Sequence, residues 1–455
     1  MNQLAKSVLE DWARVREELE SHALAPSLGQ FLDQAAAREP EKVFLHFFQH
    51  GEEYTYRDIS EQSDRLASSL CGLGVRKGSH VALMIPNGPA FIVSWFALAK
   101  IGAVMVPVNF SYTSSELAYV VSDSDSEFLI VDESLTAIFD GISEEMRRVA
   151  DENVVVVGAA AAPRHSYRAL VDAGSAPFEA PNAVAQTDLL SIQYTSGTTG
   201  LPKGCMQSHR FWLIASLVAS RGHGLEVSNI LVTFPLFYLD PQLQVLTALH
   251  GSGTAFIARQ HSLKAFVGWI KAFKIHMATI TPPVYHSIEA RPDDAENDLR
   301  FIAAFYHKED THQALEERFG AVARDAFGMT EVGVATFTPS SATHMVGSGT
   351  CGLAAPFREV RVCDEQGKEK LRGETGELCI AGDEILWGYY KRPEANANAF
   401  RGRWFRTGDL AQMDADGYLW IVGRMKDMIK RSGENIAAVE VEGVLAEHPD
   451  IVEAA

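Results

Sequence analysis

The chain has 455 residues, enough for two to three domains and a large buried core. Its formal net charge of −19 argues against general binding to nucleic acids or anionic membranes, and its longest largely apolar run, residues 90–99, is too short to span a bilayer. The acidic, amphipathic N-terminus does not resemble a signal peptide, and five widely spaced cysteines indicate free thiols in a reducing compartment. We therefore expect a cytoplasmic protein without a membrane span or a nucleic-acid partner.

Strands and helices alternate from about residue 40 onward. One helical pattern ends near Gly102, and two others cover residues 138–149 and 208–220. From about residue 359 the pattern changes to short strands and turns, for example at 360–363 and 377–380, which predicts a β-rich subdomain. Apolar strands joined by helical crossovers predict parallel sheets with helices on both faces. These strands are predicted at residues 81–85, 103–108, 128–131, 154–157, 189–192, 230–234, 254–258 and 277–280.

Residues 194–204, Tyr-Thr-Ser-Gly-Thr-Thr-Gly-Leu-Pro-Lys-Gly, combine the features of a phosphate-binding loop. Glycines allow a sharp turn and close approach to a ligand, while hydroxyls, backbone amides and a lysine between a strand and a helix suit a polyphosphate. The run is not a Walker loop, because Pro202 precedes the lysine and Gly204 follows it. A solvated turn is the alternative interpretation. The candidate phosphate ligands are Thr195, Ser196, Gly197, Thr198, Thr199, Gly200 and Lys203.

This eleven-residue run resembles the phosphate-loop signature of the adenylate-forming superfamily, which includes acyl-CoA synthetases, adenylation domains of peptide synthetases and luciferases. The length of the match, with Lys203 in register, argues against a solvated turn. Residues 54–57, 73–78 and 102–109 also resemble the early region of acyl-CoA synthetases.

The resemblance implies an α/β fold with a large N-terminal domain, residues 1–423. That domain would hold two parallel-rich sheets covered by helices and a β-rich subdomain at about 340–423. Residues 424–455 would form a hinge and the start of a small α+β C-terminal domain.

Residues 325–331, Asp-Ala-Phe-Gly-Met-Thr-Glu, resemble the family's adenine motif. The match implies that Asp325 lies at the adenine amino group and that Phe327 stacks on the base beside Gly328. Thr330 would contact the α-phosphate and Glu331 would hold Mg²⁺, with Thr195 nearby; one carboxylate plus phosphate oxygens is a reasonable magnesium site. Core packing is the alternative for Phe327 taken alone.

Residues 404–409 and 423–436 resemble the ribose and hinge motifs of the family. Asp409 would accept both ribose hydroxyls, since two carboxylate oxygens match a vicinal diol. Arg424 would also reach the ribose, and Lys426 occupies the hinge position. Lys430 would face the active site during the thioester step. The alternatives are a turn aspartate and a solvated lysine-rich loop.

The chain departs from the family pattern at two places that border the acyl or adenine pocket. Tyr238 stands where many members have histidine, and residues 304–309 replace a Gly-Gly-Ala stretch. The pattern around Tyr238 is closest to carnitine- or crotonobetaine-type CoA ligases, which indicates a short polar acid. We expect Tyr238 and Asp240 to line the acyl pocket. The alternative is that Asp240 caps a helix beginning at Pro241.

The resemblance implies an ATP-dependent acid–CoA ligase of fatty-acid or organic-acid metabolism. A carboxylate attacks the α-phosphorus of ATP, pyrophosphate leaves, and coenzyme A then displaces AMP from the acyl-adenylate. Positioning and charge stabilisation carry this chemistry. The implied catalytic residues are Thr195, Lys203, Thr330, Glu331 and Lys430. The partners would be a small carboxylic acid, ATP/AMP with Mg²⁺, and coenzyme A.

Three questions stay open at this point: which acid is activated, which thiol accepts the acyl group, and which oligomeric state the protein adopts. A homodimer is one option for the last. A stand-alone adenylation domain would load a carrier-protein thiol instead of coenzyme A. A non-catalytic nucleotide-binding protein would bind ATP without releasing pyrophosphate from any acid.

In the resembled family, a lysine near the end of the small domain bridges the substrate carboxylate and the α-phosphate. This chain ends at Ala455, soon after Lys426, and no Gly-Lys motif follows the hinge. We therefore expect a truncated chain that binds ATP, adenylates slowly and fails to form the thioester. Pyrophosphate release at the same rate from this chain and from an extended one would contradict that expectation.

Overall fold

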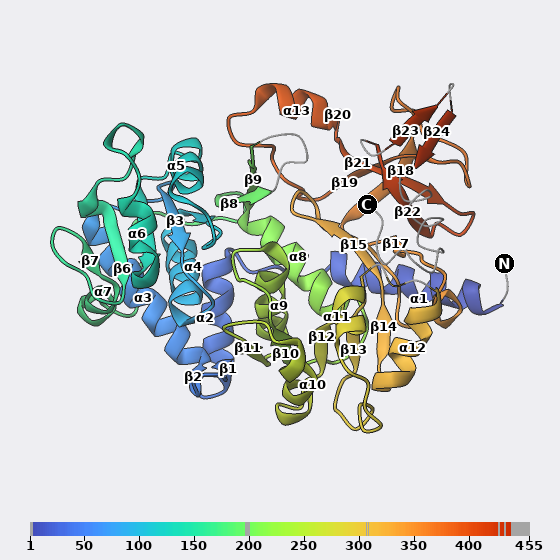
Figure 1. Ribbon diagram of the computed structural model, residues 1–455, viewed down its shortest axis with the longest axis horizontal. Coiled ribbons are helices and arrows are strands. Elements are labelled where there is room, and N and C mark those ends of the chain that lie inside the picture. The colour runs from blue at the N-terminus through green and yellow to red at the C-terminus, as the bar shows by residue number, and fades with distance from the viewer. Residues whose placement is uncertain are drawn as a thin grey trace.

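The computed structural model describes residues 3–195, 201–305, 307, 309–425, 428–431 and 434–437. Two α/β layers lie side by side, and the β-rich region lies above the second layer in the view of Figure 1. The fold is the expected one: two parallel-rich sheets, helices on their faces, and a β-rich region near the C-terminal end. The division into domains at residue 423 stays a prediction.

The first sheet has seven strands in the order β7-β6-β5-β3-β4-β8-β9, and only β9 runs antiparallel to its neighbour. Successive side chains point to opposite faces. Val81 and Leu83 therefore join one buried cluster, while Ala82 and Met84 join another. Its strands are β3 (His80–Met84), β4 (Val104–Pro107), β5 (Phe128–Asp132), β6 (Val154–Val157), β7 (His165–Ser166), β8 (Leu189–Thr195) and β9 (Lys203–Ser208). Its helices are α3 (Tyr56–Leu73), α4 (Pro89–Ile101), α5 (Ser114–Asp123), α6 (Thr136–Asp140) and α7 (Tyr167–Ala173).

The second sheet has the order β14-β13-β12-β10-β11-β1-β2, and only β2 is antiparallel. Its strands are β1 (Val43–Phe47), β2 (Glu52–Thr55), β10 (Asn229–Val232), β11 (Thr254–Ile257), β12 (Met277–Thr279), β13 (Phe301–Ala303) and β14 (Val322–Arg324). The helices of this region are α2 (Leu28–Arg38), α8 (His209–Arg221), α9 (Leu239–His250), α10 (Leu263–Ala272), α11 (Pro282–Ser287) and α12 (Glu309–Phe319).

One buried cluster includes residues of both large sheets and of the helices α2, α4, α8 and α9. Trp95 of α4 and Trp212 of α8 meet edge to face there, with ring centroids 5.3 Å apart. Because the two sheets share this helical layer, the strand ends of one sheet are fixed relative to those of the other. This shared core therefore also sets the position of any site that lies between the two large sheets.

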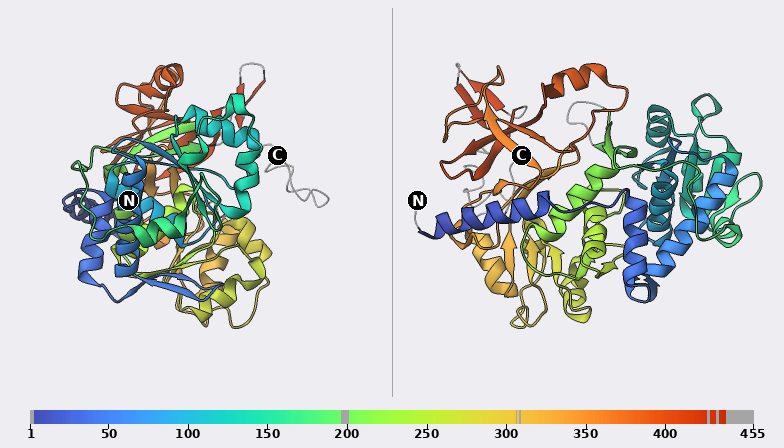
Figure 2. Two further views of the ribbon diagram at one scale, coloured as in Figure 1. Left: turned by 90° about the vertical axis from the view of Figure 1, so that its left-hand side faces the viewer. Right: turned by 180° about the vertical axis from the view of Figure 1, so that it is seen from behind.

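The β-rich region contains a three-stranded sheet, β15-β16-β17, and a sheet of β18-β19-β21-β20 with β22 paired to β21. The N-terminal helix α1 (Gln3–Glu20) packs against it from behind (Figure 2), where Trp12 donates from its indole nitrogen to the carbonyl of Ala354 at 3.0 Å. The elements are β15 (Ala326–Met329), β16 (Gly333–Phe337), β17 (Leu353–Ala354), β18 (Arg358–Cys363), β19 (Gly376–Gly382), α13 (Pro393–Ala399), β20 (Phe400–Arg401), β21 (Trp404–Met413), β22 (Leu419–Arg424), β23 (Met428–Arg431) and β24 (Glu434–Ala437).

Two expectations about local structure are wrong. The helix expected at residues 138–149 is only the short α6 and a single 3₁₀ turn at Glu144–Met146. Phe139, Ile142 and Val149 are nevertheless buried in one cluster, which explains their helix-like spacing. The phosphate loop was expected to lead from a strand into a helix, but β9 intervenes and pairs antiparallel with β8 before α8 begins.

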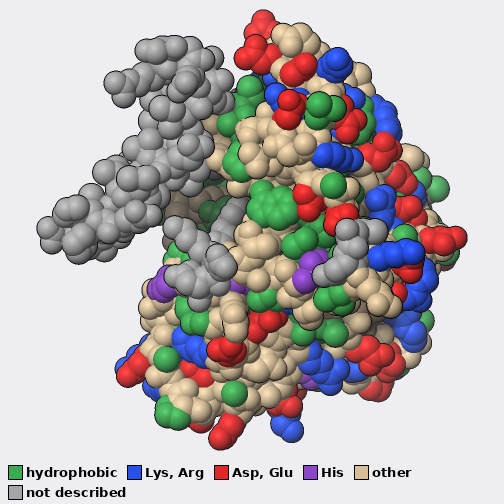
Figure 3. Space-filling model, turned by 90° about the vertical axis from the view of Figure 1, so that its right-hand side faces the viewer, with side chains coloured by type: hydrophobic (Ala, Val, Ile, Leu, Met, Phe, Trp, Pro, Cys, Tyr) green, Lys and Arg blue, Asp and Glu red, His purple; other side chains and the backbone are tan. Residues whose placement is uncertain are grey.

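The surface and the cysteines add two facts. Acidic and basic side chains are interspersed over the face in Figure 3, with hydrophobic side chains gathered near its centre. All five cysteines are free thiols, as expected. Within the described ranges, no helix has the length and apolar character needed to cross a bilayer.

Arg358 at the start of β18 ties the β-rich region together. Its side chain is buried and carries no carboxylate partner in an ion pair among the described residues; instead it donates to the carbonyl oxygens of Val332, Phe357, Asp383 and Glu384 at 2.8–3.2 Å. Burial lowers the pKa of this guanidinium to about 10. One side chain therefore fixes the end of the β15–β16 turn against the end of β19.

Replacing Arg358 by Met should lower the free energy of unfolding by about 3 kcal/mol, because several buried carbonyl oxygens lose their donor. Urea denaturation measures this. Arg361→Met is the matched control on the same strand: Arg361 lies over the ring of Trp404 at 3.9 Å, a contact worth about 1 kcal/mol. Equal losses in the two variants would contradict the role given to Arg358.

Candidate active site

The two ends of the phosphate loop face each other across a hairpin. Thr195 ends β8 and Lys203 begins β9, and the two residues are direct cross-strand partners. Gly204 follows, and a side chain there would meet Ile192, since an added Cβ would lie 2.4 Å from its Cγ2. The glycine is therefore required by packing within the sheet. The expected ligands Ser196, Gly197, Thr198, Thr199 and Gly200 lie outside the described residues.

A segment from the β-rich region pairs with the free edge of β9. The amide of Met206 donates to the carbonyl of Gly388 at 3.0 Å, and the amide of Tyr390 donates to that of Gly204 at 2.8 Å. Cys205 and Tyr389 form the bridge between these bonds. The pairing brings the ring of Tyr389 beneath Lys203, whose Nζ lies 4.7 Å from the ring centroid.

Glu331 lies at the same place, with 6% of its surface exposed. Its Oε1 accepts a hydrogen bond from the Tyr389 hydroxyl at 2.9 Å, and its carbonyl accepts from the amide of Leu386 at 2.7 Å. Burial raises the pKa of this carboxyl, while the bonds from Tyr389 and Cys205 and the charge of Lys203 oppose the rise. A single buried carboxylate beside the loop fits a Mg²⁺ ion that takes its other ligands from phosphate oxygens and water.

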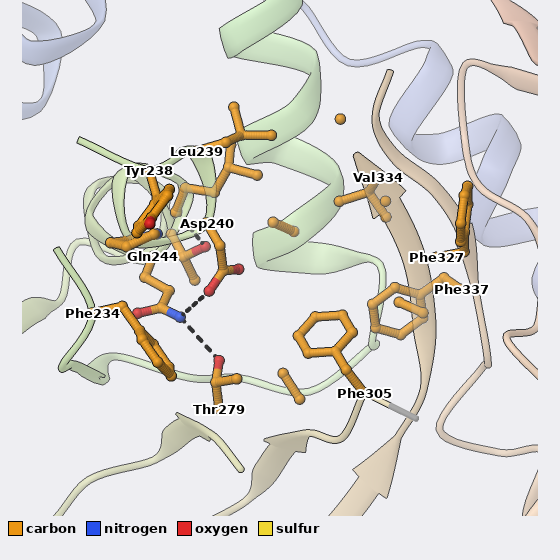
Figure 4. A pocket seen from close by; sticks show the side chains of 18 of the residues that line it. Phe234, Tyr238, Leu239, Asp240, Gln244, Thr279, Phe305, Phe327, Val334 and Phe337 are labelled. Atoms are coloured by element: carbon orange, nitrogen blue, oxygen red, sulfur yellow. Dashed lines mark hydrogen bonds between the residues drawn. The ribbon is translucent and has the colours of Figure 1, made fainter. Parts of the chain in front are cut away.

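A cavity of about 500 Å³ opens beside this group (Figure 4). Segments far apart in the chain form it: the first turn of α9, the ends of β12 and β13, and the β15–β16 hairpin. Tyr238 and Asp240 lie on one wall and Phe327 lies on the opposite side, while Gly328 and Thr330 also line the cavity. The residues matched to the acyl pocket and those matched to the adenine site thus line one continuous space.

Most of the remaining wall is aromatic or aliphatic. Phe305, within the stretch that replaces the Gly-Gly-Ala of relatives, contributes one ring. Both departures from the family pattern therefore lie at the cavity. The aromatic side chains among the lining residues are Phe234, Tyr238, Phe301, Phe305, Phe327 and Phe337.

Asp240 is the carboxylate of this cavity and does not cap a helix. Helix α9 begins at Leu239, with Tyr238 as its N-cap residue and no side-chain capping bond, so the capping interpretation is wrong. Instead, the Asp240 carboxylate accepts from Gln244 Nε2 at 2.7 Å, and that nitrogen also donates to Thr279 at 2.9 Å (Figure 4). The Asp240 side chain is exposed where it lines the cavity, and desolvation by the surrounding protein raises its pKa to about 6.

The two residues matched to the ribose are partners across the β21–β22 hairpin. Asp409 pairs with Arg424, and Arg424 Nε lies 3.0 Å from Asp409 Oδ1. Burial raises the pKa of Asp409, while the charge and hydrogen bond of Arg424 oppose the rise. Glu377 orients the residues just before Asp409, because its carboxylate accepts from Arg406 at 2.7 Å and from the amide of Gly408 at 3.2 Å.

Three other expected residues are placed less directly. Asp325 is buried immediately before β15, and its carboxylate accepts from the amide of Ala326 at 2.7 Å. Lys430 lies on β23, but its side chain lies outside the described residues, as does Lys426 entirely. Their roles stay predictions.

Sequence reasoning missed Tyr389, Glu377 and Gln244. Tyr389 lies 186 positions after Lys203 in the chain. Its ring reaches Lys203 because the segment around Tyr389 pairs with β9. Gln244 follows Asp240 by one helical turn, so its position on the same face of α9 could have been found from the spacing. No spacing or motif in the sequence pointed to Glu377.

The chain resembles known proteins along most of its length. A family model described as AMP-binding enzyme matches residues 32–390. A crotonobetaine/carnitine–CoA ligase from Salmonella paratyphi A is 30% identical over 423 residues, covering 88% of this chain and 79% of that protein. A fatty acyl-CoA synthetase from Mycobacterium tuberculosis superposes with a TM-score of 0.80 at 26% identity, over 94% of this chain and 84% of that structure. An anthranilate–CoA ligase in complex with anthranoyl-AMP shares the fold, with a TM-score of 0.84 at 24% identity, over 96% and 85% of the two chains.

Replacing Asp409 by Ala should weaken ATP binding by about 2–4 kcal/mol, because two charged hydrogen bonds to the ribose would be lost. Titration calorimetry with ATP measures the loss, and thermal melting checks that the protein stays folded. Asp416→Ala, in the turn of the same hairpin, is the control. ATP affinity equal to wild type in Asp409→Ala would rule out the ribose assignment.

Proposed function

The chain belongs to the AMP-binding family of adenylate-forming acid–CoA ligases, and from this premise we propose that it activates a short acid with a cationic or hydrogen-bond-donating group and transfers the acyl group to coenzyme A. One observation carries the proposal: a single cavity is lined by Phe327 and Thr330 of the adenine motif and by Asp240. A carboxylic acid held near Asp240 and a nucleotide held near Phe327 would meet inside that cavity.

The first step would be attack of the acid's carboxylate on the α-phosphorus of ATP, with pyrophosphate as the leaving group. The ammonium of Lys203 lies over Tyr389, which binds Glu331, so we assign Lys203 and the preceding loop to the β- and γ-phosphates. Thr330 would contact the α-phosphate, and Glu331 with Thr195 would hold Mg²⁺. Bound Mg²⁺ would offset negative charge on the phosphates. The chain's own groups would orient the reactants, which is the main source of rate when no covalent intermediate with the enzyme forms.

The second step would be attack of the coenzyme A thiol on the acyl-adenylate, releasing AMP. The names of the relatives support coenzyme A as the acceptor: two are CoA ligases and one is a fatty acyl-CoA synthetase. No described residue favours a carrier protein over coenzyme A, so the choice is left to experiment.

The substrate class follows from the wall of the cavity. Asp240 is a carboxylate among aromatic rings, which is the combination that binds ammonium groups through charge and cation–π contacts. Ionised Asp240 would instead repel a second carboxylate on the acid and would gain nothing from an alkyl chain. The 30% identical relative is named for crotonobetaine and carnitine, which are quaternary ammonium acids, and this supports the same class here.

A pyrophosphate-release screen over a panel of acids tests the proposed function. The panel should pair each short ammonium acid with its neutral carbon isostere, and mass spectrometry should detect the acyl-adenylate and the acyl-CoA. We expect pyrophosphate release with ammonium acids and a thioester with coenzyme A. ATP binding without pyrophosphate release from any acid would contradict the enzymatic proposal, and a thioester formed only on a carrier protein would contradict the acceptor.

Replacing Asp240 by Asn should raise KM for an ammonium acid about tenfold or more, because a charged contact is lost, and should leave the neutral isostere unaffected. The melting temperature at neutral pH should stay the same or rise, since a partly desolvated carboxylate with a raised pKa is removed. An unchanged ranking of the paired acids would rule out a pocket role for Asp240.

The wild-type protein should also show a pH dependence that Asp240→Asn lacks. The pKa of Asp240 is raised to about 6, so its carboxylate is charged above this pH and neutral below it. kcat/KM for an ammonium acid should therefore fall about tenfold per pH unit below 6, relative to the neutral isostere. Identical pH profiles for the two acids would contradict the role of the charge.

A further inference from the structure

Tyr389 contacts two of the proposed catalytic residues through different parts of its side chain. Its hydroxyl donates to Glu331 Oε1 at 2.9 Å, and its ring lies under Lys203 Nζ at 4.7 Å. We propose that Tyr389 is a positioning residue, which holds the Glu331 carboxylate in the orientation that receives Mg²⁺ and holds the Lys203 ammonium toward the phosphates. This inference rests on the proposed function, because it concerns the same nucleotide site.

The side chain can act in this way because its own position is fixed. Only 7% of Tyr389 is exposed, and its backbone bridges Cys205 of β9. Asn396 of α13 binds both sides of its main chain: the amide of Tyr389 donates to Asn396 Oδ1 at 2.7 Å, and Asn396 Nδ2 donates to the carbonyl of Tyr389 at 2.9 Å. At Gly388, φ is +135° and an added Cβ would lie 3.0 Å from Asn396, so this clamp requires glycine before the tyrosine.

The hydroxyl directs the carboxylate by occupying one of its oxygens. A glutamate has several rotamers, and a hydrogen bond from a fixed donor selects among them. With Oε1 accepting from Tyr389 and a further hydrogen bond coming from the Cys205 thiol, few orientations of the carboxylate remain. A carboxylate that must find this orientation at the moment of binding would bind the cation more weakly.

The ring acts on the lysine in a separate way. Lys203 has a flexible stem, and the face of an aromatic ring attracts its ammonium without consuming any of its three hydrogen bonds. Those hydrogens stay available for phosphate oxygens. The ring and the hydroxyl can therefore be tested independently.

Tyr390 provides a matched control one residue along the chain. Its hydroxyl also donates to a carboxylate, Asp125 Oδ2, at 2.9 Å. Asp125 belongs instead to a group of charges with Arg148 and Lys391, outside the residues that line the cavity. Tyr390→Phe therefore removes the same kind of bond without touching the proposed nucleotide site.

The test is titration calorimetry of ATP with Mg²⁺ and with EDTA, for wild type, Tyr389→Phe, Tyr389→Leu and Tyr390→Phe. Thermal melting of each variant checks folding. Tyr389→Phe keeps the ring, so we expect about tenfold weaker binding of Mg-ATP and a higher Mg²⁺ concentration at half-saturation, with ATP binding in EDTA unchanged. Tyr389→Leu also removes the ring, so ATP binding in EDTA should weaken as well. Tyr390→Phe should match wild type.

Each result supports or overturns the proposal. Mg-ATP affinity and Mg²⁺ half-saturation equal to wild type in folded Tyr389→Phe would overturn the role of the hydroxyl. Equal weakening with and without Mg²⁺ in Tyr389→Phe would indicate a structural role only. Wild-type ATP binding by Tyr389→Leu in EDTA would overturn the role of the ring. Failure of the wild-type protein to bind Mg-ATP would contradict the proposed function itself, which separates the two inferences.

Discussion

The candidate site depends on the two antiparallel partners of β9. On one side β9 pairs with β8, and on the other it pairs with residues 387–390, which come from the β-rich region. A strand with both edges paired has its main-chain groups satisfied and its side chains fixed in direction. The pairing thus joins the first sheet to the β-rich region at the phosphate loop. Lys203, Tyr389 and Glu331 meet because of it.

Three carboxylates of the candidate site share one electrostatic feature. Desolvation raises the pKa of Asp240, Glu331 and Asp409, and in each case a donor or a cation opposes the rise. Taking a carboxylate out of water is unfavourable unless it gains a partner. Each of these groups is therefore held ready for a hydrogen-bond donor or a positive charge. Groups perturbed in this way gather at functional sites more than elsewhere.

The acyl and adenine sides of the cavity are brought together by the shared helical layer. Helix α8 contacts β9 of the first sheet and packs against α9, which contacts β10 and β11 of the second, and the first turn of α9 faces the β15–β16 hairpin across the cavity. Of the two departures from the family pattern, Tyr238 lies at the start of α9 and Phe305 lies near Phe337, so both border the cavity from different sides.

The sequence by itself determined eight strands of the two large sheets, the helices α4 and α8 and the family, because buried parallel strands are apolar runs and the loop motif is local and long. It also indicated Asp240, Phe327, Glu331 and Asp409, since each belongs to a short motif. Local spacing was misleading at residues 138–149, where burial of scattered apolar side chains imitates a helix. Only the tertiary structure decided that a strand follows the phosphate loop, that Asp240 faces a cavity instead of capping α9, and that Tyr389 joins Lys203 to Glu331. These facts depend on pairing between segments far apart in the chain and on the direction of side chains after packing, neither of which leaves a periodic pattern in the sequence.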